Sequence, residues 1–551
     1  MKYTGNEIIL KTLINLGIDT IFGYPGGAVI DLYDAIYDHK DIITITNSHE
    51  QSAAHSADGY ARSSGKTGVC IATSGPGATN LVTGIATAFM DSVPMIALTG
   101  NVSTTLLGRD SFQEIDIVGM TIPITKHSFL IKNIEDLEYS IVRAYEIAND
   151  KRKGPVLIDI PKDIFSSKAE FKNIKAKKEG NGVVPNRDDL LKISDLINNA
   201  KKPVAYVGGG VKSSGAYLEL RKLLKKGKIP SCHTITGKGV LDPKDNLNLG
   251  LVGMHGNQSA NYAIEECDLL VAIGVRFSDR VALNRNKFAP NATIIQIDID
   301  ESEIDKNVFV DINIVCDIKD IVFELESLIL EKDRCSWQNR ITELKEKDRE
   351  LVNKEEGIKP FDLIDIINED MDENTIIVTD VGQHQMWTAQ RAKIYNPRNF
   401  ITSAGLGTMG FGMGASIGAK CANTDKEVIL ITGDGSFHMN LNELATSVFY
   451  GIKIIVIVLN NKALGMIKQW QHLIYHDRFS HTKGKDTKFD IVAKGFGAMG
   501  YDVNSLEEFR DAFNKAKESK ITSVINVNIS DKNLVLPMIP AGGTVDDLIV
   551  E

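Results

Sequence analysis

The residues best suited to chemistry lie in the segment Thr432-Gly-Asp-Gly-Ser436, which is followed 23 residues later by Asn460-Asn461. Short apolar runs at 428–431 and 454–459 precede the two segments, so Asp434 and Asn461 are predicted at the carboxyl ends of neighbouring buried strands. Open α/β sheets bind their ligands at that edge. A carboxylate, an amide oxygen and a loop carbonyl are hard oxygen ligands, and they suit Mg²⁺ bound jointly with a diphosphate.

An isolated Gly-Asp-Gly is also an ordinary strand-to-helix turn, because Gly and Asp are common turn residues. The spacing to the paired asparagines, with an apolar run before each segment, favours the metal site over a plain turn. The residues that follow, 439–449, are predicted to form a helix that carries Glu443.

Composition and charge narrow the class of protein. At 551 residues and ~150 residues per domain, the chain is expected to form three or four domains. The net charge of −10 does not favour nucleic acid or an anionic membrane as a partner. No apolar run approaches the ~18 residues that a membrane-spanning helix requires.

The six cysteines are scattered without CxxC or CxxH spacing, which argues against a zinc site or a disulfide framework. The N-terminus leads directly into an amphipathic helix without the features of a signal peptide. A cytoplasmic protein is therefore expected.

Alternating helical and short apolar segments predict an α/β fold with three doubly wound parallel-sheet domains. The predicted boundaries are an N-terminal domain at 1–170, a central domain at 188–330, a C-terminal domain at 360–530 and a tail at 531–551. Residues 173–186 are predicted to form a linker, and 331–357 a charged linker helix.

Glu50 occupies a position like that of Asp434, because it follows the predicted strand 42–46 after only three further residues. One interpretation is a solvated glutamate in the first turn of a helix, where the helix dipole favours a negative charge. The other is a functional carboxylate at a strand end, and the surrounding sequence favours it.

The segment 49–62, with Glu50, His55 and Arg62, and the spacing from Gly-Asp-Gly to Asn-Asn resemble thiamin diphosphate (ThDP) enzymes. The resemblance implies that Glu50 hydrogen-bonds N1′ of the aminopyrimidine. Further segments resemble the large-subunit family of acetohydroxyacid synthase, also called acetolactate synthase. They are Phe22-Gly-Tyr-Pro-Gly-Gly27, Ser111-Phe-Gln-Glu114, Ile124-Thr-Lys-His127, Gly154-Pro-Val-Leu-Ile-Asp-Ile-Pro-Lys-Asp163, Val275-Arg-Phe-Ser-Asp-Arg-Val281, Val381-Gly-Gln-His384, Leu464-Gly-Met-Ile-Lys-Gln-Trp470 and Met538-Ile-Pro-Ala-Gly-Gly543.

This resemblance implies three bound groups. Mg²⁺ would be held by Asp434, Asn461 and the backbone oxygen of Ala463. ThDP would be surrounded by Gly382, Gln383, His384, Gly407, Met409, Gly435, Ser436, Leu464, Gly465 and Met466. FAD would be held by Arg152, Gly208, Gly209, Gly210, Thr234, His255, Gly274, Arg276, Asp298 and Asp317.

The resemblance also implies an activity. Pyruvate would be decarboxylated and condensed with a second pyruvate or with 2-oxobutanoate, giving 2-acetolactate or 2-aceto-2-hydroxybutanoate for branched-chain amino acid biosynthesis. Arg280 would bind the carboxylate of the acceptor and Trp470 would narrow the acceptor pocket, while Gln113 and Lys162 would line its entrance.

In the family the site forms between two subunits, so the resemblance implies a homodimer or tetramer, and anabolic members also bind a small regulatory subunit. Glu50 and Asp434 lie in different predicted domains, which agrees with such a site.

Several alternatives remain open at this point. Within the ThDP enzymes they are a catabolic acetolactate synthase without FAD, another 2-oxo acid decarboxylase and a pyruvate oxidase. The segment Arg276–Arg280 favours the anabolic type. From a different class, Gly405-Leu-Gly-Thr-Met-Gly410 matches GxGxxG, but a lone match is weak support for a dinucleotide-binding protein.

Overall fold

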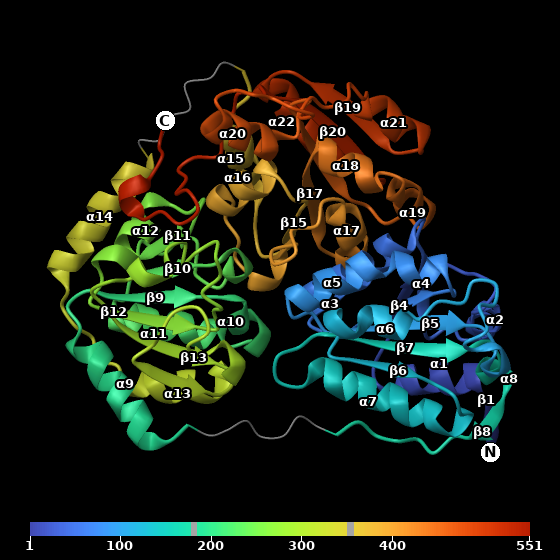
Figure 1. The fold of residues 1–551 in the computed structure, drawn as a ribbon. Helices are drawn as coiled ribbons and strands as arrows, with labels where there is room; N and C mark the ends of the chain where they lie inside the picture. The colour runs from blue at the N-terminus through green and yellow to red at the C-terminus, as the bar shows by residue number, and fades with distance from the viewer. Residues whose placement is uncertain (178–184, 350–356) are drawn as a thin grey trace. The chain divides into compact units, whose positions relative to one another are not determined.

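Three six-stranded parallel sheets follow one another along the chain in the computed structural model, which describes residues 1–177, 185–349 and 357–551 (Figure 1). The predicted α/β class with three parallel-sheet domains is confirmed. The exact domain boundaries stay predictions, and part of each predicted linker, at 178–184 and 350–356, lies outside the described residues. Within the described ranges, no helix is both long and apolar enough to cross a membrane.

In the N-terminal sheet the first strand lies between the second, which forms one edge of the sheet, and the third. Its strand order is β3 (Ile43–Thr46), β2 (Thr20–Gly23), β4 (Gly68–Ala72), β5 (Met95–Asn101), β7 (Pro155–Pro161) and β6 (His127–Leu130). Its helices are α1 (Gly5–Asn15), α2 (Ile30–Asp38), α3 (Glu50–Ser64), α4 (Pro76–Asn80), α5 (Val82–Met90), α6 (Ile117–Thr121), α7 (Leu137–Asn149) and α8 (Lys162–Ser166). A small antiparallel pair, β1 (Lys2–Thr4) and β8 (Lys168–Glu170), accompanies them.

The middle sheet has the strand order that is typical of dinucleotide-binding folds. That order is β11 (Asn248–Leu251), β10 (Ser231–His233), β9 (Pro203–Val207), β12 (Leu269–Ile273), β13 (Thr293–Asp298) and β14 (Ile312–Val315). The helices are α9 (Arg187–Asn199), α10 (Gly209–Ser214), α11 (Tyr217–Gly227), α12 (Gln258–Glu266), α13 (Ile318–Leu328) and α14 (Cys335–Arg349).

The C-terminal sheet repeats the topology of the N-terminal sheet. Its strand order is β16 (Phe400–Thr402), β15 (Thr375–Thr379), β17 (Glu427–Gly433), β18 (Ile455–Asn460), β20 (Ser523–Asn528) and β19 (Met499–Val503). The helices are α15 (Pro360–Asp370), α16 (Gln383–Arg391), α17 (Phe411–Ala422), α18 (Asp434–Asn440), α19 (Glu443–Phe449), α20 (Gly465–Tyr475), α21 (Phe489–Gly495) and α22 (Leu506–Glu518).

The predicted helix at 439–449 is wrong in its bounds, because two short helices occupy this part of the chain. Helix α18 already begins at Asp434, and α19 begins at Glu443 after a break at residues 441–442. Tertiary contacts on both sides of the break account for it. Asn440 Nδ2 donates to the carbonyl oxygen of Gly410 at 2.6 Å, and the Glu443 carboxylate accepts from the backbone N–H of Ser48 in the N-terminal half at 2.9 Å.

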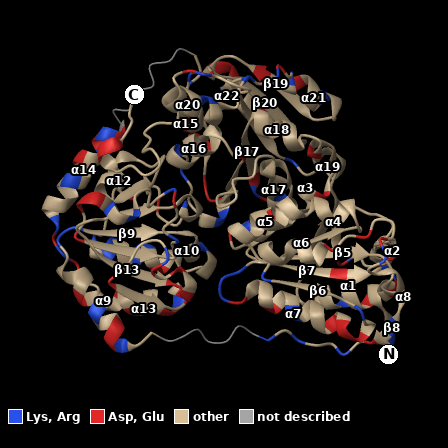
Figure 2. Ribbon diagram, in the orientation of Figure 1, with Lys and Arg blue, Asp and Glu red and all other residues tan. Residues whose placement is uncertain are grey.

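The described chain forms two compact units. The N-terminal and C-terminal sheets together form the first unit. The middle sheet forms the second, with residues 385–400 and the tail from 529. Lys, Arg, Asp and Glu lie mostly on helices and loops, with both signs interspersed (Figure 2). This distribution leaves the sheets largely apolar.

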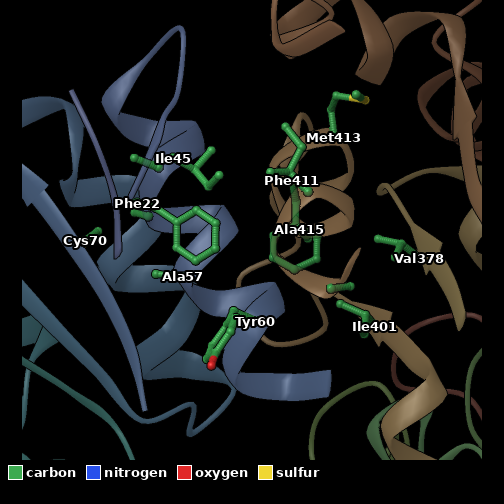
Figure 3. Close-up of a cluster of buried hydrophobic side chains, with 14 of the residues drawn as sticks. Phe22, Ile45, Ala57, Tyr60, Cys70, Val378, Ile401, Phe411, Met413 and Ala415 are labelled. Carbon is green, nitrogen blue, oxygen red and sulfur yellow. The ribbon is translucent and has the colours of Figure 1, made fainter. Parts of the chain in front are cut away.

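Helices α3 and α17 join the two halves of the first unit. Small residues allow their backbones to approach closely: a Cβ on Gly418 would lie 1.8 Å from Ser56 O, and a Cβ on Gly59 would lie 2.1 Å from Ala415 O. Apolar side chains of both halves form one core around this crossing, with Ala57 on one side and Ala415 on the other (Figure 3). The two halves are therefore packed as one body rather than linked by chain alone.

Candidate functional site

Asp434 and Asn461 are brought together because β17 and β18 pair in parallel and end at the same edge of the sheet. Gly433, the last residue of β17, pairs with Leu459 of β18. The Asp434 carboxylate accepts hydrogen bonds from the backbone N–H groups of Gly435 and Asn461. Burial raises the pKa of Asp434 to about 6, although these hydrogen bonds favour the anion. The predicted pair is thus adjacent at the ends of β17 and β18, beside the switch point between β15 and β17, and ligands bind at this edge of such sheets.

The side chains around this pair come from separate segments of the C-terminal half. Asn461 Nδ2 donates to Gln383 Oε1 at 3.2 Å, and Asn461 Oδ1 accepts from the backbone N–H of Ala463 at 3.0 Å. A Cβ on Gly465 would lie only 2.0 Å from Gln383 Oε1. Position 465 therefore has no room for a side chain beside the Asn461 amide.

Gly435 lies close to two other residues that were predicted to surround ThDP, Leu464 and Met409. A Cβ there would lie 2.9 Å from Leu464 Cδ2 and 3.7 Å from Met409 Cε. Gly407, which precedes Met409, has a positive φ of +70° that favours glycine. The structure therefore gathers residues of the 405–410 loop, the α18 start and the α20 start around one space.

His384 and Ser436, which were also predicted to surround ThDP, lie on the β15 side of this site. A Cβ on Gly382 or on Gly433 would lie 2.9 Å from the His384 ring, and burial lowers the pKa of His384 to about 3. The Ser436 hydroxyl donates to the carbonyl oxygen of Val381 at 2.8 Å. Met466 lies in the first turn of α20, next to Gly465.

Sequence reasoning missed several residues that hold this site. His438 bonds through Nδ1 to the carbonyl oxygen of Asp434 and through Nε2 to Thr487 Oγ1, both at 2.7 Å. A Cβ on Gly484 would lie 2.8 Å from Asp434 Oδ2. Helical spacing from Asp434 is the signal that could have indicated His438, since residues four apart share a helix face. No local pattern linked Gly484 or Thr487 to Asp434.

Asp380 is a further missed carboxylate, and it is fully buried beneath the site. It accepts from the backbone N–H of Gly410 at 2.8 Å and from Thr432 Oγ1 at 3.1 Å. Burial raises its pKa to about 6. Asp380 therefore ties the loop that carries Met409 to the strand that leads to Asp434.

Glu50 is the first residue of α3, and the residues around its carboxylate belong to the N-terminal half. Asn80 Nδ2 donates to Glu50 Oε2 at 2.9 Å, and a Cβ on Gly77 would lie 3.2 Å from Glu50 Oε1. Gln113 packs against Gly75, two residues from Gly77. Gln113 is thus placed beside the same loop that passes Glu50, whereas Lys162 is exposed at the start of α8.

The predicted glycines of the middle sheet meet at its own switch point, between β9 and β12. A Cβ on Gly208 would lie 2.2 Å from Gly274 O, and one on Gly210 would lie 2.6 Å from Gly274 Cα. A Cβ on Gly209 would approach Thr236 Oγ1 to 3.0 Å. Bare backbone therefore lines the place where a dinucleotide diphosphate binds in this topology.

The other residues predicted for FAD lie at the strand ends of the same edge. Thr234 follows β10, and its hydroxyl accepts from Gly237 N–H at 3.0 Å. Asp298 ends β13, and Asp317 caps α13 by accepting from Lys319 N–H at 2.9 Å. His255 Nδ1 is buried without a hydrogen-bond partner among the described residues, and burial lowers the pKa of His255 to about 4.

The two arginines predicted to hold FAD, Arg276 and Arg152, have hydrogen bonds within the protein. Arg276 follows Gly274 after one residue, and its carbonyl oxygen accepts from Asn307 Nδ2 at 3.0 Å. Arg152 belongs to the first unit, where its Nε donates to Ser92 Oγ at 3.0 Å. A shared site for Arg152 and the middle sheet stays a prediction.

Three protein families match successive parts of the chain. Residues 3–120 match the thiamine pyrophosphate enzyme N-terminal TPP binding domain, 190–325 the central domain and 380–527 the C-terminal TPP binding domain. The probable acetolactate synthase large subunit of Methanocaldococcus jannaschii is 46% identical, with 99% of this chain and 95% of the relative aligned. The chain belongs to the acetolactate synthase large-subunit family.

Two other relatives of the acetolactate synthase family align over similar lengths. The large subunit from Buchnera aphidicola is 41% identical over 99% of this chain and 98% of its own length. The isozyme 2 large subunit from Escherichia coli is 38% identical over 99% of both. The chain thus spans nearly the full length of these acetolactate synthase subunits.

As a member of the acetolactate synthase family, the chain carries ThDP-binding domains at both ends, and the middle sheet separates them in the sequence. The described residues contain no group of three or more His, Cys, Asp or Glu side chains that could hold a metal ion. The predicted Mg²⁺ site therefore relies on one carboxylate, Asp434, with amide and carbonyl oxygens. This donor set fits Mg²⁺ shared with a diphosphate.

The acceptor residues predicted from the acetolactate synthase resemblance lie in different units. Arg280 is in the second unit, where its side chain is 68% exposed and pairs with Asp279 at 3.8 Å. Trp470 is half-buried on α20 of the first unit. Their meeting at one acceptor pocket stays a prediction.

Proposed function

We propose that this chain is the catalytic subunit of an acetolactate synthase. It decarboxylates pyruvate and joins the remaining two-carbon unit to a second pyruvate or to 2-oxobutanoate. The products are 2-acetolactate and 2-aceto-2-hydroxybutanoate, at the first common step of branched-chain amino acid biosynthesis. The adjacency of Asp434 and Asn461 beside the switch point of a thiamine pyrophosphate enzyme sheet carries the proposal.

The first unit holds ThDP and Mg²⁺ in this proposal. Asp434, Asn461 and the carbonyl oxygen of Ala463 bind Mg²⁺. Gly435 and Gly465, at the starts of α18 and α20, offer bare backbone to the diphosphate. When bound, ThDP supplies the electron sink for decarboxylation. Glu50 holds a proton at N1′ of the aminopyrimidine, the role of a positioned acid and base.

The substrates meet residues of several elements. Arg280 offers a guanidinium to the carboxylate of the acceptor, since a planar fork matches a carboxylate through two hydrogen bonds. Trp470 narrows the acceptor pocket and favours the longer side chain of 2-oxobutanoate by contact. Gln113 and Lys162 line the entrance, and the exposed position of Lys162 is compatible with that role.

FAD binds to the middle sheet in this proposal and has no redox step in the reaction. The strand order and the bare backbone at Gly208, Gly210 and Gly274 support a dinucleotide at this edge. The buried and unpaired His255 Nδ1 supports a further polar partner there. Protein purified with FAD is expected to be yellow.

The catalytic site is completed by a second copy of the chain, in a homodimer or a tetramer. The contacts of Glu50 come from its own N-terminal half, which supports a partner subunit as the source of the diphosphate-binding half. The relatives are named large subunits, which supports a small regulatory subunit as a further partner. A cytoplasmic location stays a prediction of the cysteine pattern.

The test is incubation of the purified protein with pyruvate, with and without ThDP, Mg²⁺ and FAD, followed by identification of the product. Acetolactate that requires both ThDP and Mg²⁺ is the expected result. Acetaldehyde would indicate a simple decarboxylase, and acetyl phosphate with peroxide would indicate a pyruvate oxidase. Full activity of FAD-free protein would indicate the catabolic acetolactate synthase instead.

A further inference from the structure

The short segment 46–49, from the last residue of β3 to the residue before α3, is held by the C-terminal half as well as by its own domain. In its own domain, Asn47 N–H donates to the carbonyl oxygen of Gly23 and Asn47 Nδ2 donates to Ser56 Oγ, both at 3.0 Å. The backbone N–H of Thr46 donates to Tyr450 Oη at 3.0 Å, and Ser48 Oγ lies 3.2 Å from Thr446 Oγ1. Ser48 Oγ also donates to the carbonyl oxygen of Asn442 at 3.3 Å. Helix α19 and the residues that flank it thus hold residues 46 and 48 of the segment.

Glu443 makes the central contacts of this arrangement. Its Oε1 accepts from the backbone N–H of Ser48 at 2.9 Å, and its Oε2 accepts from Asn47 Nδ2 at 3.1 Å and from Thr446 Oγ1 at 2.7 Å. The residue is 0% exposed. A carboxylate that is taken out of water at a junction of two halves is costly unless it is well hydrogen-bonded, so these contacts define its position closely.

The segment leads directly to the predicted catalytic glutamate. His49 caps α3 by accepting from Gln51 N–H at 3.1 Å, and Glu50 is the first residue of the helix. We infer that Glu443 is a positioning residue for Glu50, because it fixes the backbone at Ser48 two residues before the Glu50 carboxylate must meet the coenzyme. The inference rests on the proposed function, in which Glu50 acts on the aminopyrimidine.

The change Glu443→Gln tests this role with little change in volume. Both carboxylate oxygens accept hydrogen bonds, whereas a primary amide offers one acceptor oxygen and an NH₂ group. If the amide oxygen faces Ser48 N–H, the NH₂ group faces the NH₂ group of Asn47. One donor of the segment then loses its acceptor, and the start of α3 shifts or loosens.

The first measurement is a double-mutant cycle on turnover with Glu443→Gln, Glu50→Gln and the double variant. Glu443→Gln alone is expected to lower kcat by about tenfold to a hundredfold with little change in the KM for pyruvate, because a misplaced catalytic group loses rate. In the Glu50→Gln background the same change is expected to lower the residual kcat by less than twofold. Non-additivity of this kind shows that the two residues act as one unit.

The second measurement needs no coenzyme. Hydrogen exchange of peptides covering 46–52 is expected to be faster in Glu443→Gln than in the unchanged protein, while peptides covering α22 keep their rates. Tyr450→Phe removes the acceptor for Thr46 N–H and is a milder variant, with a smaller change in the same peptides. Glu507→Gln, at an exposed position of α22, is the matched control and leaves both kcat and exchange unchanged.

Equal losses of kcat from Glu443→Gln in both backgrounds, or an unchanged kcat with unchanged exchange at 46–52, would overturn the positioning role. A protein that makes no acetolactate before any substitution contradicts the proposed function instead. The exchange measurement still decides in that case whether Glu443 fixes the segment.

Discussion

Glu50 and Asp434 are the two carboxylates on which the proposed chemistry depends, and each occupies the first residue of a helix that follows a parallel strand. At this position the backbone N–H groups of the helix start are not yet paired, and they favour a negative charge. Their neighbours differ. Asp434 is nearly fully buried among backbone donors, whereas Glu50 is half-buried beside Asn80.

Glu50→Gln is expected to abolish most of the turnover and to leave coenzyme binding in place. The amide keeps the size of the side chain but cannot exchange a proton with N1′, and a positioned acid and base contributes about 10²–10⁴-fold to a rate. Acetolactate formation and a fluorescence titration with ThDP measure the two effects. Turnover close to that of the unchanged protein would remove Glu50 from the catalytic role.

Because His55 is buried in its neutral form, the folded protein is expected to lose stability in acid. His55 is fully buried on α3, and burial, with smaller effects of Arg62 and His49, lowers its pKa to about 3. The unfolded chain takes up this proton near pH 6.5 and the folded chain does not, so stability falls as the pH drops below 6.5. Between pH 7.5 and pH 5, the His55 side chain alone is expected to lower the free energy of unfolding by about 2 kcal/mol.

Thermal unfolding of the unchanged protein and of His55→Gln at the two pH values isolates this contribution. The advantage of the unchanged protein in Tm is expected to shrink, or to reverse, on going from pH 7.5 to pH 5. Parallel shifts of both proteins with pH would contradict the assignment to His55.

At the scale of elements, the crossing of α3 and α17 decides how the two halves of the first unit fit. A buried ionic group reinforces it: Arg62 of α3 pairs with Asp58 and with Asp91, and Asp91 accepts from the backbone N–H groups of Ala404 and Gly405. The loop that carries Gly407 and Met409 is therefore anchored to the N-terminal half.

Gly418→Ala is expected to destabilise the first unit by roughly 2–3 kcal/mol, because the added methyl group would meet the backbone at Ser56 and Tyr60, which cannot move aside cheaply. Thermal unfolding measures the effect. Gly495→Ala is the control, since a Cβ at this exposed helix end meets nothing within 4 Å. Equal Tm values for the two variants would contradict the close packing of α3 and α17.

The sequence predicted the elements with a strong local signal and missed those without one. The apolar runs of β17 and β18 were recognisable because strands buried on both faces are continuously apolar. Strand β10, Ser231-Cys-His233, and strand β19, with Tyr501 and Asp502, carry polar residues and have no such pattern. Their place depends on pairing with β9 and β20.

The same distinction holds for the site. Asp434, Asn461 and Glu50 stand in recognisable segments, so their types and spacing were enough to propose them. Glu443, Asp91 and Gly484 act through partners far away in the sequence, and only the folded chain brings them to Ser48, Gly405 and Asp434. The break between α18 and α19 was missed for the same reason.

At the scale of the whole molecule, the proposed function requires that one ThDP is bound by Glu50 of one chain and Asp434 of another. Mixing two inactive variants, Glu50→Gln and Asp434→Ala, tests this claim most directly. In randomly mixed dimers, half of the molecules contain both variants, and each of these has one site with both carboxylates intact. About one quarter of the unchanged activity is therefore expected to return on mixing. A mixture that forms mixed dimers and stays as inactive as its two components would contradict a coenzyme site shared between two chains.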